Sequence, residues 1–140
     1  MSLEKIKDIH SDFKKALERL KEALNEDLSI GSIVIDATIQ RFEFTFELGW
    51  KLAKSILNYN GIEAEGPRFV IKEAFQAKLI KDGDAWIDML EDRNKTSHIY
   101  DEKQALKIYK KIKETHFKLL KDFASKTERF IDQNANEEGK

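Results

Sequence analysis

The sequence lacks cysteine altogether and has only one proline and six glycines among its 140 residues. Without cysteine the chain can form neither disulfides nor thiolate metal sites, although this does not fix its compartment. The scarcity of proline and glycine, with 36% charged residues, favours long amphipathic helices over a sheet protein. No apolar run is long enough to span a bilayer, and the charged N-terminal segment is unlike a signal peptide. We therefore expect a cytoplasmic protein without membrane contact.

Neither sign of charge predominates, since the sequence has 25 Lys and Arg residues and 26 Asp and Glu residues. A protein that binds nucleic acid through its overall charge is usually more basic, so any such contact must come from a local site. The length fits one domain with one hydrophobic core. We expect that domain to span residues 1–132 and residues 133–140 to form a disordered tail.

Apolar residues recur at spacings of three and four, which predicts an all-α, up-and-down bundle of four to five helices. The predicted helices cover about residues 2–27, 32–60, 67–80, 84–93 and 102–131. In the first of them, His10 interrupts the apolar seam, and we expect a backbone or water partner for it. We also expect Gly61 to end the second helix, Pro67 to lie in the first turn of the third, and Asp84 to cap the fourth.

The predicted second helix is apolar around most of its circumference, so it is either central in its bundle or buried on a second side by another subunit. A small monomer has too few other helices to cover it completely. We therefore predict a homodimer that uses the second and fourth helices. Glu43 and Glu47 lie on the remaining polar stripe and could be metal ligands or acid–base groups. They lack the Glu-x-x-His partner of metal sites in helical bundles, so we expect ion pairs instead. Glu47 would pair with Lys51, and one of the two glutamates with Arg93.

Arg93, His98 and Tyr100 fall within eight residues, where one predicted helix stops and the next begins. Arg93 lies on the buried stripe of its helix and must find a carboxylate, a phosphate or water. The residues between Arg93 and His98 favour caps and turns, so the helix should end there and let His98 approach Arg93. Asp101 should cap the last helix, with Gln104 completing an approximate capping box.

An imidazole beside an arginine fits cleavage of an RNA phosphodiester without metal or cofactor. A base takes the proton of the 2′-hydroxyl, arginine stabilises the developing charge, and an acid protonates the leaving 5′-oxygen. One histidine cannot easily be base and acid at once, and a two-fold dimer would supply a second His98. No metal-ligand cluster or Gly-rich phosphate loop is found in the sequence. The lysines on the exposed side of the last helix form a solvated face that could extend an RNA groove, and His116 should be structural.

Residues 93–100 read Arg-Asn-Lys-Thr-Ser-His-Ile-Tyr and resemble the Arg-x4-His-x-Tyr motif of HEPN-domain proteins, specifically the HepT-like toxins. These proteins have also been described as nucleotidyltransferase substrate-binding proteins. Residues 40–51, 71–75 and 86–94 resemble other segments of that family in the same order, so the resemblance covers roughly residues 3–123. It implies an all-α homodimer with the motif at the subunit interface and a metal-independent endoribonuclease activity.

The resemblance also implies roles for three residues and a partner. His98 would be catalytic, Arg93 would bind or stabilise phosphate, and Tyr100 would accept AMP from a cognate nucleotidyltransferase of the MNT type that acts as antitoxin. The alternative is a non-catalytic chain, the substrate-binding or adaptor subunit of a two-component nucleotidyltransferase. Arg93 would then be a structural ion-pair residue and Tyr100 a packing residue.

Overall fold

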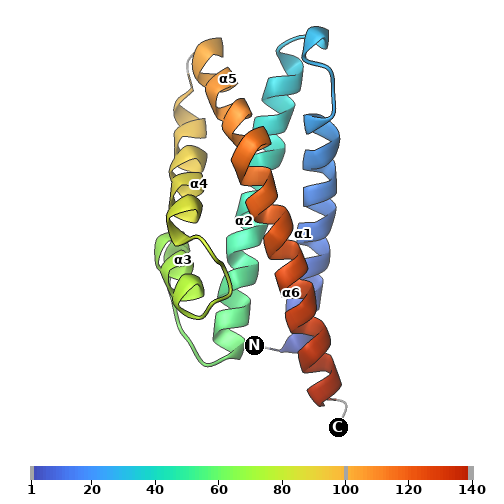
Figure 1. The fold of residues 1–140 in the computed structure, drawn as a ribbon, viewed down its shortest axis with the longest axis vertical. Coiled ribbons are helices and arrows are strands. Elements are labelled where there is room, and N and C mark those ends of the chain that lie inside the picture. The colour runs from blue at the N-terminus through green and yellow to red at the C-terminus, as the bar shows by residue number, and fades with distance from the viewer. Residues whose placement is uncertain (1, 100, 139–140) are drawn as a thin grey trace.

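The computed structural model describes residues 2–99 and 101–138, and within them every regular element is a helix (Figure 1). Neighbouring long helices run in opposite directions, which confirms the predicted all-α, up-and-down bundle. The α-helices are α1 (Leu3–Leu24), α2 (Ile33–Tyr59), α3 (Gly66–Gln76), α4 (Gly83–Lys95), α5 (Glu102–Lys111) and α6 (Phe117–Glu138). Two 3₁₀ turns, η1 (Leu28–Ile30) and η2 (Thr96–His98), and a π-helical segment, η3 (Ile112–His116), complete the described elements.

Individual residues with a known preference for helix ends determine where these helices begin and stop. Gly61 has a φ of +81° and ends α2, as predicted, because a residue without Cβ adopts this left-handed conformation at little cost. Pro67 lies in the first turn of α3, also as predicted. The expected cap of α4 was wrong. Asp82, not Asp84, accepts a hydrogen bond from the backbone N–H of Ala85 over 3.0 Å, and Asp84 lies inside the first turn.

Aromatic side chains from four helices meet in the core. Trp86 of α4 packs against Phe46 of α2 and Phe123 of α6, with ring centroids 6.2 and 5.3 Å apart. Phe13 of α1 packs against Phe123 at 5.9 Å. His10 is buried nearby, and its Nε2 lies 3.1 Å from the backbone oxygen of Ala124, which confirms the backbone partner expected for it.

The last predicted helix is continuous from α5 to α6, but its middle is the π-helical segment η3. It also continues to Glu138, beyond the expected end near Ile131. Asn134 supports this extension, because its side-chain amide donates to the backbone oxygen of Phe130 over 2.8 Å. The boundary of the domain at residue 132 stays a prediction.

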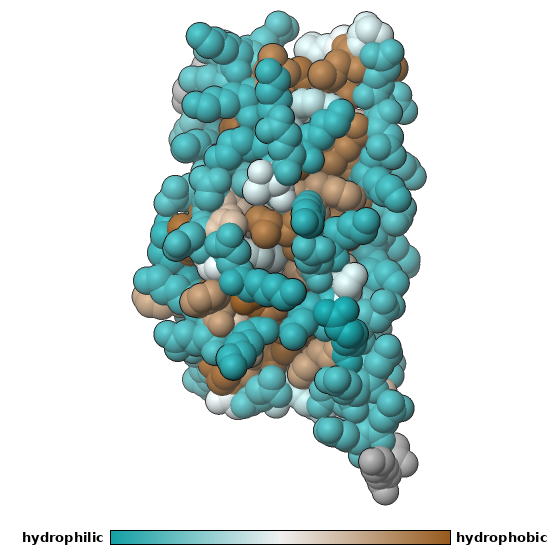
Figure 2. Space-filling model, viewed as in Figure 1, coloured by the Kyte–Doolittle hydropathy of each residue, from teal (hydrophilic) through white to brown (hydrophobic). Residues whose placement is uncertain are grey.

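Charged and polar residues cover most of the face formed by α5 and α6, and apolar residues show between the helices (Figure 2). Among the described residues, no helix is both long and apolar enough to cross a membrane. Part of the apolar surface of α2 stays uncovered, because Ile33 is 68% exposed and Phe44 61%. Phe69 and Phe75 on α3 are also exposed. The predicted homodimer would cover some of this surface and stays a prediction.

Candidate functional site

Arg93 lies in the last turn of α4 and is anchored to α2. Its Nη2 donates to Oε2 of Glu47 over 3.1 Å. The same glutamate oxygen accepts a hydrogen bond from Nε1 of Trp50 over 3.1 Å, and Oε1 lies 3.4 Å from Nζ of Lys51. The expected pair of Glu47 with Lys51 is therefore confirmed, and Glu47 is the glutamate that pairs with Arg93. The Arg93 side chain is still 37% exposed, so part of its guanidinium can meet a ligand.

The chain leaves α4 through the short turn η2, which ends at His98. The hydroxyl of Thr96 donates to the backbone oxygen of Arg93 over 2.6 Å, and that of Ser97 to the oxygen of Asn94 over 3.2 Å. These bonds satisfy carbonyl groups at the end of α4, as expected of residues that favour caps and turns. The predicted end of the helix in this stretch is confirmed, and His98 is exposed immediately after it.

His98 lines a pocket of about 290 Å³ between the end of α4 and α5. Arg93 does not line this pocket, because its side chain turns to α2 instead. The structure thus brings the two residues to the same end of α4 but not into one pocket. The other lining residues are Asp92, Lys95, Ile99, Gln104, Lys107, Ile108 and Lys111.

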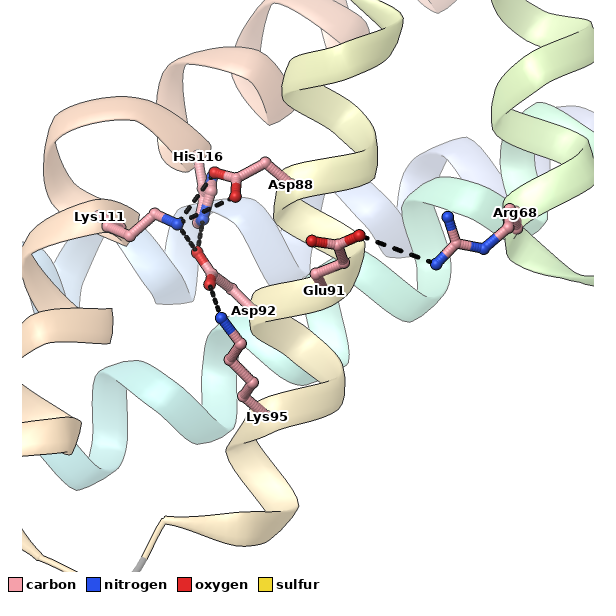
Figure 3. Close-up of polar contacts among 7 residues, drawn as sticks. All are labelled: Arg68, Asp88, Glu91, Asp92, Lys95, Lys111 and His116. Carbon is pink, nitrogen blue, oxygen red and sulfur yellow. Dashed lines mark hydrogen bonds and ion pairs between the residues drawn. The ribbon is translucent and has the colours of Figure 1, made fainter.

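At the inner end of this pocket lies a buried ion-pair network that crosses from α4 to α5 and η3 (Figure 3). Asp92 is only 2% exposed, and its Oδ2 lies 2.7 Å from both Nζ of Lys111 and Nε2 of His116. Lys111 also reaches Oδ2 of Asp88 over 2.9 Å. His116 is fully buried and stacks on Phe42 with ring centroids 5.5 Å apart. One ammonium therefore bridges two carboxylates of α4.

Burial alone would raise the pKa of Asp92, but hydrogen bonds and charge from His116 and Lys111 outweigh it and lower that pKa below its usual range. Burial also disfavours the charged form of Lys111, and the two carboxylates overcome this effect and raise its pKa. Nδ1 of His116 is buried without a partner in the described chain.

Sequence reasoning did not find this network. Lys111 and His116 are five residues apart, which would place them about 140° apart around an α-helix. The π-helical turn joins residues five apart, so both side chains reach the same carboxylate. The predicted structural role of His116 fits its complete burial. A π-turn leaves no clear signal in the apolar periodicity, so the sequence offered no pattern from which this network could be predicted.

Asp88, Asp92 and His116 offer three possible metal-ligand atoms within 4.8 Å of one another. The ammonium of Lys111 already lies against both carboxylates, so a divalent cation would have to displace it. This competition makes the cluster a poor metal site while Lys111 is charged.

Tyr100 lies outside the described residues, and its role stays a prediction. On either side of it the backbone is extended, at Ile99 and at Asp101. Oδ1 of Asp101 accepts a hydrogen bond from the backbone N–H of Gln104 over 2.8 Å, which confirms the predicted cap of the last helix.

Comparison with known proteins identifies relatives of this chain. The family described as nucleotidyltransferase substrate binding protein like matches residues 8–129. The chain is 36% identical over 84 residues to a Haemophilus influenzae protein named probable ribonuclease HepT. This match covers 56% of the chain and 58% of that relative, so the aligned part is less than two thirds of its length.

Three solved structures share the fold. A protein from Thermus thermophilus is 34% identical, with a TM-score of 0.68 over 86% of this chain and 97% of its own. A tri-AMPylated HEPN toxin of Shewanella oneidensis, solved in complex with MNT antitoxin, is 18% identical, with a TM-score of 0.73 over 89% and 96%. A Haemophilus influenzae protein described as a nucleotidyltransferase substrate binding domain is 22% identical, with a TM-score of 0.64 over 89% and 98%. At such identities the last two show the fold alone.

Proposed function

The chain belongs to the nucleotidyltransferase substrate-binding family of HepT-like HEPN proteins, and from this premise we propose that it is a metal-independent endoribonuclease toxin. The observation that carries the proposal is the placement of two side chains at one end of α4. Arg93 is anchored by Glu47 and remains partly exposed, and His98 is exposed on a pocket five residues later. The relative named probable ribonuclease HepT supports the same activity.

In the proposed reaction, His98 accepts the proton of a ribose 2′-hydroxyl. The 2′-oxygen then attacks the adjacent phosphorus, the bond from phosphorus to the 5′-oxygen breaks, and that oxygen leaves with a proton from a general acid. The products are a 2′,3′-cyclic phosphate and a 5′-hydroxyl. Arg93 stabilises the charge on the phosphorane, because a guanidinium has five N–H donors and Glu47 accepts only one of them in the described contacts.

A homodimer would supply the second histidine that the reaction needs. Phe44 lies three residues before Glu47 on α2, so both fall on the same side of that helix. Phe44 is 61% exposed although it is a large apolar side chain beside the anchor of Arg93. A second copy seated on α2 and α4 would bury Phe44 and bring two motifs together. Its His98 would act as the acid while the first acts as the base.

We further propose that a cognate MNT-type nucleotidyltransferase silences the toxin by transferring AMP to Tyr100. The Shewanella oneidensis neighbour, a tri-AMPylated HEPN toxin in complex with MNT antitoxin, supports this type of regulation. Ile99, the residue before Tyr100, lines the pocket of His98, so AMP on Tyr100 would be attached next to that pocket. AMP would add bulk and negative charge close to the site that must accept an RNA phosphate.

The second candidate function is a non-catalytic substrate-binding or adaptor subunit of a nucleotidyltransferase. It is favoured by the likeness to the Haemophilus influenzae protein described as a substrate binding domain. The ion pair between Arg93 and Glu47 would then have only a structural role. Under this alternative the purified chain has no ribonuclease activity of its own.

A ribonuclease assay separates the two functions. The purified full chain, in buffer with EDTA, is incubated with a labelled RNA, beside His98→Ala and the neighbouring variant Ser97→Ala. We expect wild type and Ser97→Ala to cleave, and His98→Ala to be slower by about 10²–10⁴. Cleavage that occurs without EDTA but not with it would contradict metal independence, and the absence of cleavage by wild type in both buffers would favour the adaptor.

A further inference from the structure

Lys111 is a lysine whose position and charge are both fixed. Its ammonium lies 2.7 Å from Asp92 and 2.9 Å from Asp88, so two carboxylates of α4 hold it (Figure 3). The anchor is rigid, because Asp92 and its other partner His116 are buried in the core. The Asp88 carboxylate contacts the ammonium through both of its oxygens, Oδ1 at 3.1 Å and Oδ2 at 2.9 Å, so Lys111 would act on a ligand through its charge. The Lys111 side chain is 33% exposed and lines the pocket beside His98, where its charge can act on a ligand.

Two further lysines, Lys95 and Lys107, line the same pocket. Lys95, at the end of α4, is 68% exposed and lies 4.0 Å from Asp92, which is too long for a strong contact. Lys107 lies one turn before Lys111 on α5 and is exposed. Three ammonium groups therefore line this pocket, against the single carboxylate of Asp92. In a chain with a net charge of −1, such a concentration of positive charge is a local feature.

The shape of the pocket limits the ligand. Its volume of about 290 Å³ is at the lower end of ligand pockets, which span about 300–1,000 Å³. It has room for one phosphate with its sugar rather than for a folded partner. Ile99 and Ile108 add apolar surface against which a ribose can pack. The same pocket is lined by His98, the residue to which the proposed function assigns proton transfer.

Resting on the proposed function, we infer that this pocket binds the phosphate of an RNA nucleotide next to the cleaved bond. Lys111 is the fixed contact to that phosphate. Lys95 and Lys107 bind it from the rim of the pocket. Arg93 binds the scissile phosphate on the other side of α4. A single RNA strand therefore crosses the end of this helix. The buried network of Asp92 and His116 thereby orients a group that binds substrate.

The test uses RNA binding rather than cleavage. The full chain carrying His98→Ala is titrated with a fluorescent single-stranded RNA of about 12 nucleotides, within the site sizes of single-strand binders, at several salt concentrations. In that background, Lys95→Ala/Lys107→Ala is compared with Lys103→Ala/Lys110→Ala, which removes the same charge from exposed positions that do not line the pocket. All four lysines are exposed, so these changes should leave folding intact.

We expect the pocket pair to weaken RNA binding at least about tenfold and the control pair less than about threefold. The slope of log affinity against log salt should become shallower by about 0.7 for each phosphate that the variant no longer binds, as for single strands. Lys111→Met should weaken binding further, and its thermal unfolding is followed in parallel because it also breaks the buried network. Equal weakening by both pairs, or no RNA binding by the parent chain, would overturn the inference.

The outcome is separable from the fate of the proposed function. One outcome is that the pocket pair, and not the control pair, loses RNA affinity while wild type cleaves no RNA. In that case the phosphate site is retained and the ribonuclease proposal is rejected. If wild type cleaves RNA and Lys95→Ala/Lys107→Ala, made in the chain that keeps His98, cleaves with an unchanged KM, the ribonuclease proposal is retained and the phosphate site is rejected.

Discussion

Nη2 of Arg93 donates to Oε2 of Glu47 over 3.1 Å and so joins the end of α4 to the middle of α2 across 46 residues of sequence. Trp50 donates to the same oxygen and holds the carboxylate in place. An arginine fixed in this way keeps its remaining donors in a constant orientation, which favours the recognition of phosphate oxygens. Glu47 is therefore a positioning residue in the proposed ribonuclease.

Glu47→Gln should slow cleavage about tenfold in kcat, because the neutral amide holds the guanidinium less firmly. The free energy of unfolding should fall by less than about 1 kcal/mol, since both side chains are about one third exposed. Glu43→Gln, one turn earlier on α2, is the matched control. Cleavage assays and urea denaturation measure the two effects, and equal loss of kcat in both variants would refute the positioning role.

Arg93→Ala and His98→Ala should differ in stability although both lose cleavage. His98 is exposed at the end of η2, so its loss should leave the unfolding transition unchanged. Arg93→Ala removes the partner of Glu47 and should lower the free energy of unfolding by up to about 1 kcal/mol. Thermal unfolding followed by circular dichroism checks this difference. A His98→Ala chain that cleaves like wild type, with contaminating nuclease excluded, would remove His98 from the mechanism.

Asp92→Asn should be the most destabilising single change near the site. It leaves Lys111 without its nearest carboxylate and His116 without an anionic acceptor, at a cost of about 3 kcal/mol at pH 7. Because the pKa of Asp92 is lowered on folding, its contribution is complete above the unfolded value of 3.8 and is lost as the pH falls through the lower, folded value.

Urea denaturation of wild type and Asp92→Asn between pH 3 and pH 7 tests this linkage. The difference in unfolding free energy should be constant from about pH 5 to pH 7 and shrink below about pH 4. Asp88→Asn is a suitable control, since Asp88 is half-exposed and makes only the contact to Lys111 in this network. A difference that grows as the pH falls would show that the sign of the pKa shift is wrong.

Phe44→Asp should dissociate the proposed homodimer. The new charge would have to be buried at the subunit interface, which is strongly unfavourable. Phe69→Asp on α3 is the matched control, because Phe69 is similarly exposed but lies on another helix. Analytical ultracentrifugation at micromolar concentration measures the association, and cleavage should fall with it. A wild-type chain that is already monomeric would remove the argument for a shared site.

The sequence predicted the features that depend on local chemistry. The periodicity of apolar residues predicted the helices. The polar stripe of α2 was enough to predict the pair of Glu47 with Lys51 and a pair of one glutamate with Arg93, but not that Glu47 rather than Glu43 makes the second pair. Asp82 and Asp84 are both good capping residues two positions apart, so composition could not decide between them. The π-turn that aligns Lys111 with His116 leaves no signal in the apolar periodicity, so the network it forms was not predicted.

The last prediction concerns Tyr100, which would carry AMP from the cognate MNT-type nucleotidyltransferase. Incubation of the chain with that enzyme and ATP should add the mass of AMP to Tyr100 and suppress cleavage. The physical reason is electrostatic and steric. Ile99, the residue before Tyr100, lines the pocket of His98, Lys95 and Lys107, and a bulky anion on the next residue would occupy the place of the RNA phosphate.

Tyr100→Phe separates modification from catalysis, because it removes only the hydroxyl that accepts AMP. This variant should cleave RNA at the wild-type rate and remain active after incubation with the nucleotidyltransferase and ATP. Tyr109→Phe is a control, since Tyr109 is fully buried in α5 and out of reach of another enzyme. Mass mapping that places AMP only on another residue, or silencing of Tyr100→Phe to the same degree as wild type, would contradict the assignment. Slow cleavage by unmodified Tyr100→Phe would instead mean that the hydroxyl takes part in catalysis, and its modification would block the reaction directly.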